Sequence, residues 1–285
     1  MIPMHMLPAR VLNFRPNPDH RRTPIEMLAE KLGWAAMAAP PFTPVSWDSI
    51  AGIALDQGGH GACEGHSHSK GLRMALQIAG TPLAWDPSPD GLYKIARCIE
   101  RNGRKVALTD SGTESAYICM GINLWGVHPM GGPVQDPDDS GPRNSDVNNT
   151  SVNAEPTYVE LEKDSESLFI GQYSAEGTSA ATRLAAVNLA LSKGYMPTIG
   201  GDVDSAYMGW EPSDGVYPGC NPKDIQGGHS QLIIANRISI VNSAEYDYQI
   251  LNSWGPWCDR GRVWVRQKFI LDAMEITAMS VRRAS

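Results

Sequence analysis

The sequence predicts an α+β fold in which a helical N-terminal half precedes a β-rich C-terminal half. In the first half, three successive stretches show the apolar spacing of amphipathic helices, each with a start or stop signal at its ends. In the second half, one further helical stretch is followed by short runs with β character. This order predicts a helical lobe followed by a β-rich lobe.

The first predicted helix is the best defined of the three. Leu72, Ala75 and Leu76 share one face, and Gly80 is placed to stop the helix. The three predicted helices are residues 63–79, a second that opens at Ser88-Pro89 and stops before Gly103, and a third that opens with a capping box at Ser111-Gly112-Thr113-Glu114 and runs to about Trp125.

The β-rich half contains one predicted hairpin that brings distant residues together. The turn Asn242-Ser243-Ala244-Glu245 joins two runs, which places His229 and Asn252 at facing ends of antiparallel strands. The predicted elements here are a helix at Thr178–Lys193 and β runs at Met196–Val203, Gln231–Ile240, Tyr246–Leu251, Arg262–Val265 and Ile276–Val281.

The composition excludes several classes of function. The chain has 285 residues and a formal net charge of −7, without a basic stripe, so we expect no nucleic-acid partner. No apolar run approaches the ~20 residues of a membrane span, and Met1–Pro8 lacks the apolar core of a signal peptide. Five scattered cysteines are typical of a reducing compartment. These features predict a cytoplasmic or virion-associated protein without a membrane partner, and we expect neither a metal nor another cofactor.

One cysteine has the surroundings of a nucleophile. Gln57 lies six positions before Cys63, with a glycine-rich loop between them, and the first predicted helix follows. At a helix N-terminus the dipole and the unsatisfied N–H groups favour an anion, so a thiol there should ionise more easily. His229 and Asn252 supply an acid/base group and an amide that could orient it.

These segments together resemble the papain family of cysteine peptidases. His60-Gly61-Ala62-Cys63-Glu64 agrees with the family signature at its three central positions. The segment that carries the family's Asn resembles Asn252-Ser253-Trp254-Gly255-Pro256-Trp257. The approach to the family's His resembles Gly215–Cys220, and the glycine-bearing wall of its cleft resembles Asp110–Thr113. The resemblance covers residues 42–285.

The resemblance implies a two-lobed papain-like fold, with a helical lobe, a β-barrel-like lobe and the active-site cleft between them. It implies an endopeptidase in which Cys63 is the nucleophile, His229 the proton shuttle, Asn252 its orienting group and Gln57 an oxyanion donor. Trp254 would shield the His–Asn contact, and Ser111, Gly112 and Gly228 would lie along a peptide substrate. The implied site residues are Cys63, His229, Asn252 and Gln57 for catalysis, and Ser111, Gly112, Gly228 and Trp254 for substrate binding.

The implied domain organisation has three parts. Residues 1–41 form an N-terminal arm with a predicted helix that starts at Thr23-Pro24. The catalytic domain, 42–285, has a helical lobe at about 42–130, a polar insertion at about 131–160 and a β-rich lobe at about 161–285. The insertion is acidic but lacks the order of a calcium loop, so we interpret it as solvated surface.

Three positions depart from the family pattern. Gly228 precedes His229 at a position where many relatives have Asp. Glu64 stands where an aromatic residue is usual, and it could favour a protonated His229 or raise the pKa of Cys63. His60 replaces a cysteine that forms a bridge in secreted relatives, so we expect no disulfide there.

Two alternatives remain open. A papain-like fold can act as an acyl transferase or as an inactive binding module, since a fold does not fix an activity. His60, Cys63, His66 and His68 are all residue types that bind zinc, and they lie within nine positions.

Overall fold

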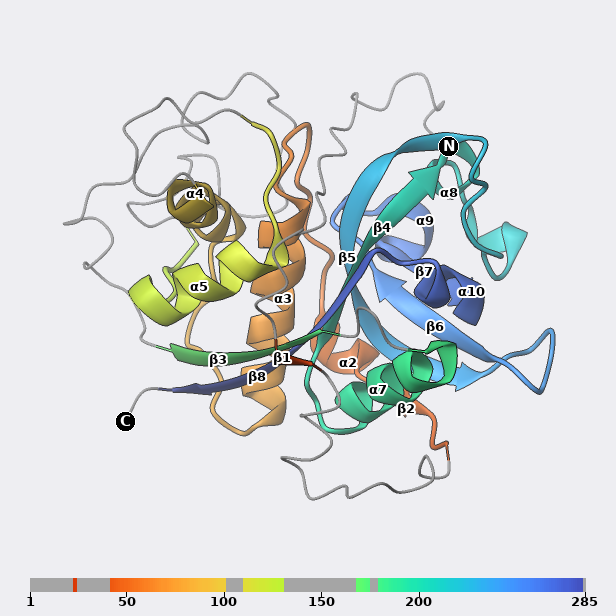
Figure 1. The fold of residues 1–285 in the computed structure, drawn as a ribbon, viewed down its shortest axis with the longest axis horizontal. Helices are drawn as coiled ribbons and strands as arrows, with labels where there is room; N and C mark the ends of the chain where they lie inside the picture. Colours follow the sequence, from red (N-terminus) through yellow and green to blue (C-terminus); the bar gives the residue numbers. More distant parts are fainter. Residues whose placement is uncertain (1–22, 25–41, 101–109, 131–167, 175–178, 284–285) are drawn as a thin grey trace.

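The computed structural model describes residues 23–24, 42–100, 110–130, 168–174 and 179–283 (Figure 1). Two lobes lie side by side, with helices on one side and most of the sheet on the other. The predicted helical and β-rich halves are therefore confirmed. The rest of the N-terminal arm and the polar insertion at 131–160 lie outside the described residues. In the described parts of the chain, every helix is too short or too polar to cross a membrane.

Three helices build the helical lobe: α3 (Cys63–Ile78), α4 (Pro89–Glu100) and α5 (Ser115–Trp125) (Figure 1). Helix α3 begins at Cys63, as predicted, and ends before Gly80, whose φ of 75° suits glycine. Helix α4 begins after Ser88, whose hydroxyl accepts a hydrogen bond from the Gly91 N–H at 2.8 Å.

The capping box predicted for α5 is wrong. The helix starts at Ser115, and Glu114, the residue before it, is extended. Gly112 has a φ of 76°, and its N–H donates to the Tyr93 hydroxyl at 3.0 Å. This contact holds the backbone out of the helical region, so the helix cannot begin at the residues that the local pattern indicates.

One open sheet spans both lobes, in the order β1-β3-β8-β4-β5-β6-β7, with β2 pairing onto β5. All of its pairs are antiparallel except β1 with β3, and the path does not close into a barrel. Its strands are β1 (Thr23–Pro24), β2 (Val45–Ser46), β3 (Leu168–Ser174), β4 (Pro197–Asp204), β5 (Ile225–Ile238), β6 (Tyr246–Leu251), β7 (Arg262–Arg266) and β8 (Glu275–Arg283).

Three features of the sheet differ from the sequence prediction. The segment Thr23–Pro24 is a strand paired with β3, so the predicted helix start there is wrong. Strand β3 was not predicted, and its partner β8 is far along the chain. Strand β5 begins at Ile225, before His229, because β4 supplies partners for this polar, glycine-rich stretch.

Helix α7 and several shorter helices complete the β-rich lobe, where the largest apolar core lies. This core gathers side chains from β5, β6, β7 and α10, among them Ile233, Ile250, Val265 and Phe269. The helices on this side are α2 (Asp48–Ala51), α7 (Ala180–Ser192), α8 (Ser205–Met208), the 3₁₀ turn η3 (Pro212–Asp214), α9 (Trp257–Arg260) and α10 (Gln267–Leu271).

Helix α3 connects the two lobes. Its residues Leu72 and Leu76 pack into the core of the helical lobe together with Met279 of β8. At Gly71 an added Cβ would lie 2.8 Å from Met279 and 3.0 Å from Leu232 of β5. The helix therefore lies tightly against the sheet, which fixes the position of its first residue, Cys63, relative to β5.

Candidate active site

A hydrogen bond joins the two residues that the predicted hairpin was expected to bring together. Strands β5 and β6 pair with Leu232 opposite Leu251. Just beyond this pair, His229 Nε2 lies 2.7 Å from Asn252 Oδ1, and both side chains are buried. The hairpin prediction is confirmed, and two residues 23 positions apart meet at the end of the strands.

The tautomer of this histidine follows from the same contacts. The Ser253 N–H donates to Asn252 Oδ1 at 2.7 Å, which identifies that atom as the oxygen of the amide. Because an amide oxygen only accepts, His229 Nε2 must carry the hydrogen of the 2.7 Å contact. The proton that His229 gains or loses is therefore carried by Nδ1.

The indole of Trp254 covers the histidine. The two rings are stacked with centroids 4.5 Å apart and an interplanar angle of 21°, and Trp254 is 1% exposed. Such a cover excludes water from the His229–Asn252 bond, which strengthens it electrostatically.

Cys63 lies at the start of α3 and against the strand that carries His229. The backbone of Ser230, the residue after His229, makes a hydrogen bond to the Cys63 sulfur. Burial, and next the charge of Glu64, raise the pKa of the Cys63 thiol to about 12, although backbone hydrogen bonds at the helix start act in the opposite direction. The easier ionisation predicted from the helix N-terminus is therefore wrong for this closed, buried site.

The side chain of Gln57 is held at both ends. Its Nε2 donates to the His60 carbonyl at 2.7 Å, and its Oε1 accepts from the Ser253 hydroxyl at 2.5 Å. A backbone hydrogen bond from the Gln57 N–H to the Ser253 carbonyl, 2.8 Å, fixes the main chain beside it. An amide nitrogen has two hydrogens, so Nε2 has a second donor with a fixed direction.

The segment with Ser111 and Gly112 is tied to the loop before Cys63. Asp110 accepts from the Gly61 N–H at 2.9 Å and from the Tyr93 hydroxyl at 2.7 Å. The same hydroxyl accepts from the Gly112 N–H. Ser111 is half-buried. These bonds place the two glycine-bearing loops side by side.

Gly228 adds no side chain to the site. It lies in β5 opposite Asp202 of β4. Because glycine has no side chain, this residue does not cover the backbone beside His229.

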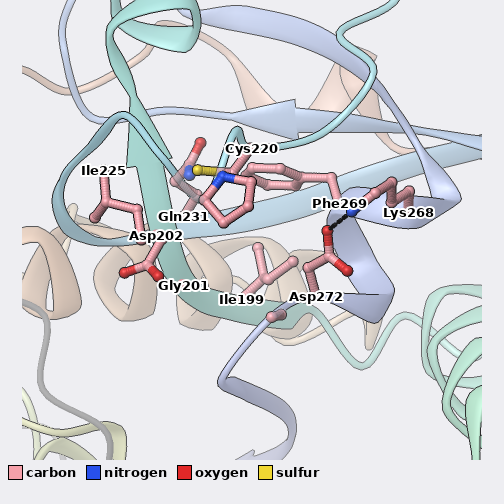
Figure 2. Close-up of a pocket in the computed structure, with 11 residues that line it drawn as sticks. Ile199, Gly201, Asp202, Cys220, Ile225, Gln231, Lys268, Phe269 and Asp272 are labelled. Carbon is pink, nitrogen blue, oxygen red and sulfur yellow. Dashed lines mark hydrogen bonds and ion pairs between the residues drawn. The ribbon is translucent and has the colours of Figure 1, made fainter.

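A hollow of about 200 Å³ lies next to this strand pair (Figure 2). Gly201, which pairs with His229, forms part of its wall, and Cys63 does not. Partial burial raises the pKa of the Asp202 carboxyl at its edge. The remaining wall contains Ile199, Cys220, Pro222, Ile225, Gln231, Lys268, Phe269, Asp272 and Ala273.

The three histidines near Cys63, which with it form the possible zinc site, have separate partners. His66 Nδ1 lies 2.9 Å from the Ala62 carbonyl, His68 contacts Glu64, and His60 lies 4.0 Å from Asp110. Among the residues that the structure describes, there is no cluster of three or more His, Cys, Asp or Glu side chains that could hold a metal ion. All five cysteines lie in these residues, and none forms a disulfide.

A buried polar network behind Cys63 was not predicted. It consists of the Glu64–His68 pair, with Nδ1 and Oε2 3.1 Å apart, and of a Ser67–Ser230 hydroxyl contact of 2.9 Å. The four-residue spacing of Glu64 and His68 on a predicted helix is the signal that could have found the pair.

Comparison with solved structures identifies the architecture. Xylellain, a cysteine protease from Xylella fastidiosa, has a TM-score of 0.66 and 16% identity, with 97% of this chain and 98% of that chain covered. Procathepsin B S9 from Trypanosoma congolense has a TM-score of 0.62 and 12% identity, covering 98% and 87%. The digestive procathepsin L 3 of Tenebrio molitor has a TM-score of 0.58 and 16% identity, covering 95% and 77%.

No protein-family model matches the sequence, and no curated relative does either. The similar structures nevertheless extend over nearly the whole chain and are all cysteine proteases. The chain therefore has the fold of the papain-like cysteine proteases.

Proposed function

We propose that this protein is a cysteine peptidase that hydrolyses peptide bonds with Cys63 as nucleophile, His229 as proton shuttle and Asn252 as orienting group. The observation that carries the proposal is the buried 2.7 Å bond from His229 Nε2 to Asn252 Oδ1, next to a cysteine at a helix start. A nucleophile, a base and a group that orients the base are the components of a triad.

The first chemical step follows from the tautomer. Because the pKa of the Cys63 thiol is raised to about 12, the sulfur has to lose its proton to a base during the reaction. His229 Nδ1 accepts that proton, and Asn252 stabilises the resulting imidazolium through Nε2–H. The sulfur then attacks the substrate carbonyl carbon, and the carbonyl π electrons move to the oxygen.

Two donors are available for that oxyanion. The backbone N–H of Cys63 is one, and the second Nε2 hydrogen of Gln57 is the other. The anchors on Ser253 and His60 prevent the Gln57 amide from turning away, which is the preorganisation that oxyanion stabilisation requires. Collapse of the intermediate breaks the C–N bond, and His229 Nδ1–H protonates the leaving amine.

The second half of the reaction uses the same groups. Water enters after the amine leaves, and His229 Nδ1 takes its proton as the water attacks the thioester carbon. The C–S bond then breaks, and the proton returns to the Cys63 sulfur. Ser111, Gly112 and Gly228 border the substrate in this proposal, and Trp254 keeps water away from the His229–Asn252 bond.

The test is a time course of cysteine alkylation on the wild type and on His229→Ala. Iodoacetamide labelling at pH 7.5 is mapped to each cysteine by mass spectrometry, and a peptidyl epoxide is used in a second series. We expect Cys63 to label faster than the more exposed Cys220 and Cys258, because His229 removes the Cys63 proton in this proposal. This order is the reverse of the order of the thiol pKa values, since burial raises the pKa of Cys220 and of Cys258 to about 11 and that of Cys63 to about 12.

The same time course separates the alternatives. The His229→Ala variant should slow labelling of Cys63 and leave Cys220 unchanged, because only Cys63 depends on the imidazole. An inactive module predicts slow labelling of Cys63 that is equal in the two proteins. An acyl transferase predicts His229-dependent labelling, with acyl transfer to an added amine in place of hydrolysis. Equal rates in both proteins would end the peptidase proposal.

A further inference from the structure

The first two turns of α3 are polar and nevertheless buried. Their side chains have exposed fractions from 0 to 7%, in a position where a helix between two lobes would normally present apolar residues. The buried polar residues after Cys63 are Glu64, His66, Ser67, His68, Ser69 and Lys70. Burying polar groups has a free-energy cost unless they form hydrogen bonds or ion pairs. The partners of these side chains therefore decide what the buried polar residues do.

Glu64 and His68 form an ion pair inside the helical lobe. His68 Nδ1 lies 3.1 Å from Glu64 Oε2, and the side chains are 0% and 2% exposed, respectively. On its other side, His68 Nε2 lies 2.8 Å from the hydroxyl of Ser115, the first residue of α5. His68 Nδ1 also lies 2.9 Å from the Glu64 backbone carbonyl, so both ring nitrogens have hydrogen-bond partners, as a protonated imidazole requires.

A second branch connects this pair to the strand that carries His229. The Ser67 hydroxyl donates to the Glu64 carbonyl at 3.1 Å and lies 2.9 Å from the Ser230 hydroxyl. The network thus extends from Glu64, next to the nucleophile, across the contact between α3 and β5. The network is anchored in three elements, α3, α5 and β5, and the contact of the Glu64 carboxylate with His68 lies within it.

Stability alone does not account for a buried ion pair. The desolvation of two charges offsets most of their attraction, and replacement by apolar residues is often neutral or stabilising. The pair does, however, act on the nucleophile, since the charge of Glu64 adds to burial in raising the pKa of Cys63. Burial lowers the pKa of His68, but the hydrogen bonds to Cys119 and Glu64 and the charge of Glu64 outweigh it and raise the value to about 10.

We propose that Glu64 and His68 are positioning residues that set how readily Cys63 ionises. The carboxylate opposes the thiolate and the imidazolium partly offsets that charge, so Cys63 remains a thiol until His229 removes its proton. The inference rests on the proposed function of Cys63 and His229. It adds a consequence: the Glu64 carboxylate makes oxidation and alkylation of Cys63 slower than they would be without it, because the thiolate is the reactive form.

Other titratable or charged groups also face this region, and all of them stay unchanged in Glu64→Gln, His68→Gln and the double variant. They are His229 from β5, Cys119 from α5, Tyr93 and Arg97 from α4, and Asp110 and His60 from the adjoining loops.

The experiment measures the rate of Cys63 alkylation by iodoacetamide from pH 5 to 10 in the wild type, Glu64→Gln and His68→Gln. Removing the carboxylate should lower the pKa of the Cys63 thiol by about 1 unit. That pKa lies above the measured range, so the change is read from the rate in the rising part of the profile, where it displaces Glu64→Gln to lower pH by about half a unit. The gain in thiolate is partly offset by its lower nucleophilicity, so the rate at pH 7.5 should rise about threefold. In His68→Gln the carboxylate is no longer offset, and the profile should shift to higher pH.

Glu245→Gln is the matched control. It makes the same substitution in the ion pair with Arg266, at the turn of the β5–β6 hairpin farthest from His229, and should leave the profile unchanged. If Glu64→Gln does not fold, the double variant Glu64→Gln/His68→Gln carries the test, because it leaves no unpaired buried charge. It should also shift the profile to lower pH.

The outcomes distinguish this inference from the proposed function. If the Glu64→Gln profile, or that of the double variant in its place, matches the wild type or shifts to higher pH, the inference is overturned. Opposite shifts in Glu64→Gln and His68→Gln support it and exclude a merely structural role. A parallel His229→Ala sample tests the proposed function separately, since that function requires slower labelling whatever Glu64 does.

Discussion

Replacing Lys70 with methionine should stabilise the protein by an amount that depends on pH. Lys70 lies on α3 and is 7% exposed. Burial, and next repulsion from Arg73, lower the pKa of its ammonium from 10.5 to about 8, while attraction from Asp86 opposes this. A buried ammonium costs free energy as long as it stays protonated. Methionine keeps the unbranched stem and removes the charge.

The size and sign of the effect follow from proton linkage. Between pH 8 and 10.5 the unfolded chain holds the proton of Lys70 more tightly than the folded chain, so wild-type stability rises with pH in this window. The interval between those two values, at about 1.36 kcal/mol for each pH unit, corresponds to about 3 kcal/mol. Lys70→Met should therefore be more stable by up to about 3 kcal/mol below pH 8, and the gain should vanish above pH 10.5.

The assay is urea denaturation of both proteins at intervals from pH 6 to 11. Groups that titrate in both proteins, Cys63 among them, cancel in the difference between the two free energies of unfolding. Lys193→Met, at an exposed lysine, is the control and should change the stability by less than about 0.5 kcal/mol at every pH. A difference between wild type and Lys70→Met that stays constant through pH 8–10.5 would refute the reasoning.

Three further predictions concern the site and its support. Gln57→Ala should lower kcat/KM by roughly 10²–10³ in a folded variant, because one oxyanion donor is lost; near-normal turnover would remove Gln57 from the mechanism. Reductant should leave the thermal midpoint unchanged, since none of the five cysteines is bridged; a loss near ~2 kcal/mol on reduction would contradict this. Gly65→Ala should destabilise by about 1–3 kcal/mol in urea titrations, because its Cβ would lie 2.2 Å from the Pro89 carbonyl oxygen; unchanged stability would show that α4 moves aside.

The sequence could predict the parts of the site that local patterns determine. Helical periodicity and Gly80 defined α3, so Cys63 was correctly placed at a helix start. The Asn242 turn predicted the hairpin, and it forms with the Glu245 N–H donating to the Asn242 carbonyl at 2.9 Å. The hydrogen bond between His229 and Asn252 follows from that register.

Other features depend on tertiary contacts that no local pattern contains. The start of α5 is set by the bond from Gly112 to Tyr93, which belongs to another helix. The raised pKa of Cys63 comes mainly from burial under both lobes, whereas the sequence indicated only the helix N-terminus. The Glu64–His68 pair has an i,i+4 signal, but its burial becomes visible only when α5 brings Ser115 against it.

Strand β8 belongs to both lobes, and this limits how the molecule can move. Its first residues pair with β4 and its last with β3, while Thr277 and Ala278 pair with both (Figure 1). The lobes therefore share a continuous ladder of backbone hydrogen bonds and cannot swing apart as rigid bodies around a flexible linker. The amide hydrogens of Thr277 and Ala278 should exchange with solvent only when that ladder breaks, as part of global unfolding. A ligand between the lobes has to fit their fixed separation, because a wider separation would break the backbone hydrogen bonds between β8 and its two neighbouring strands.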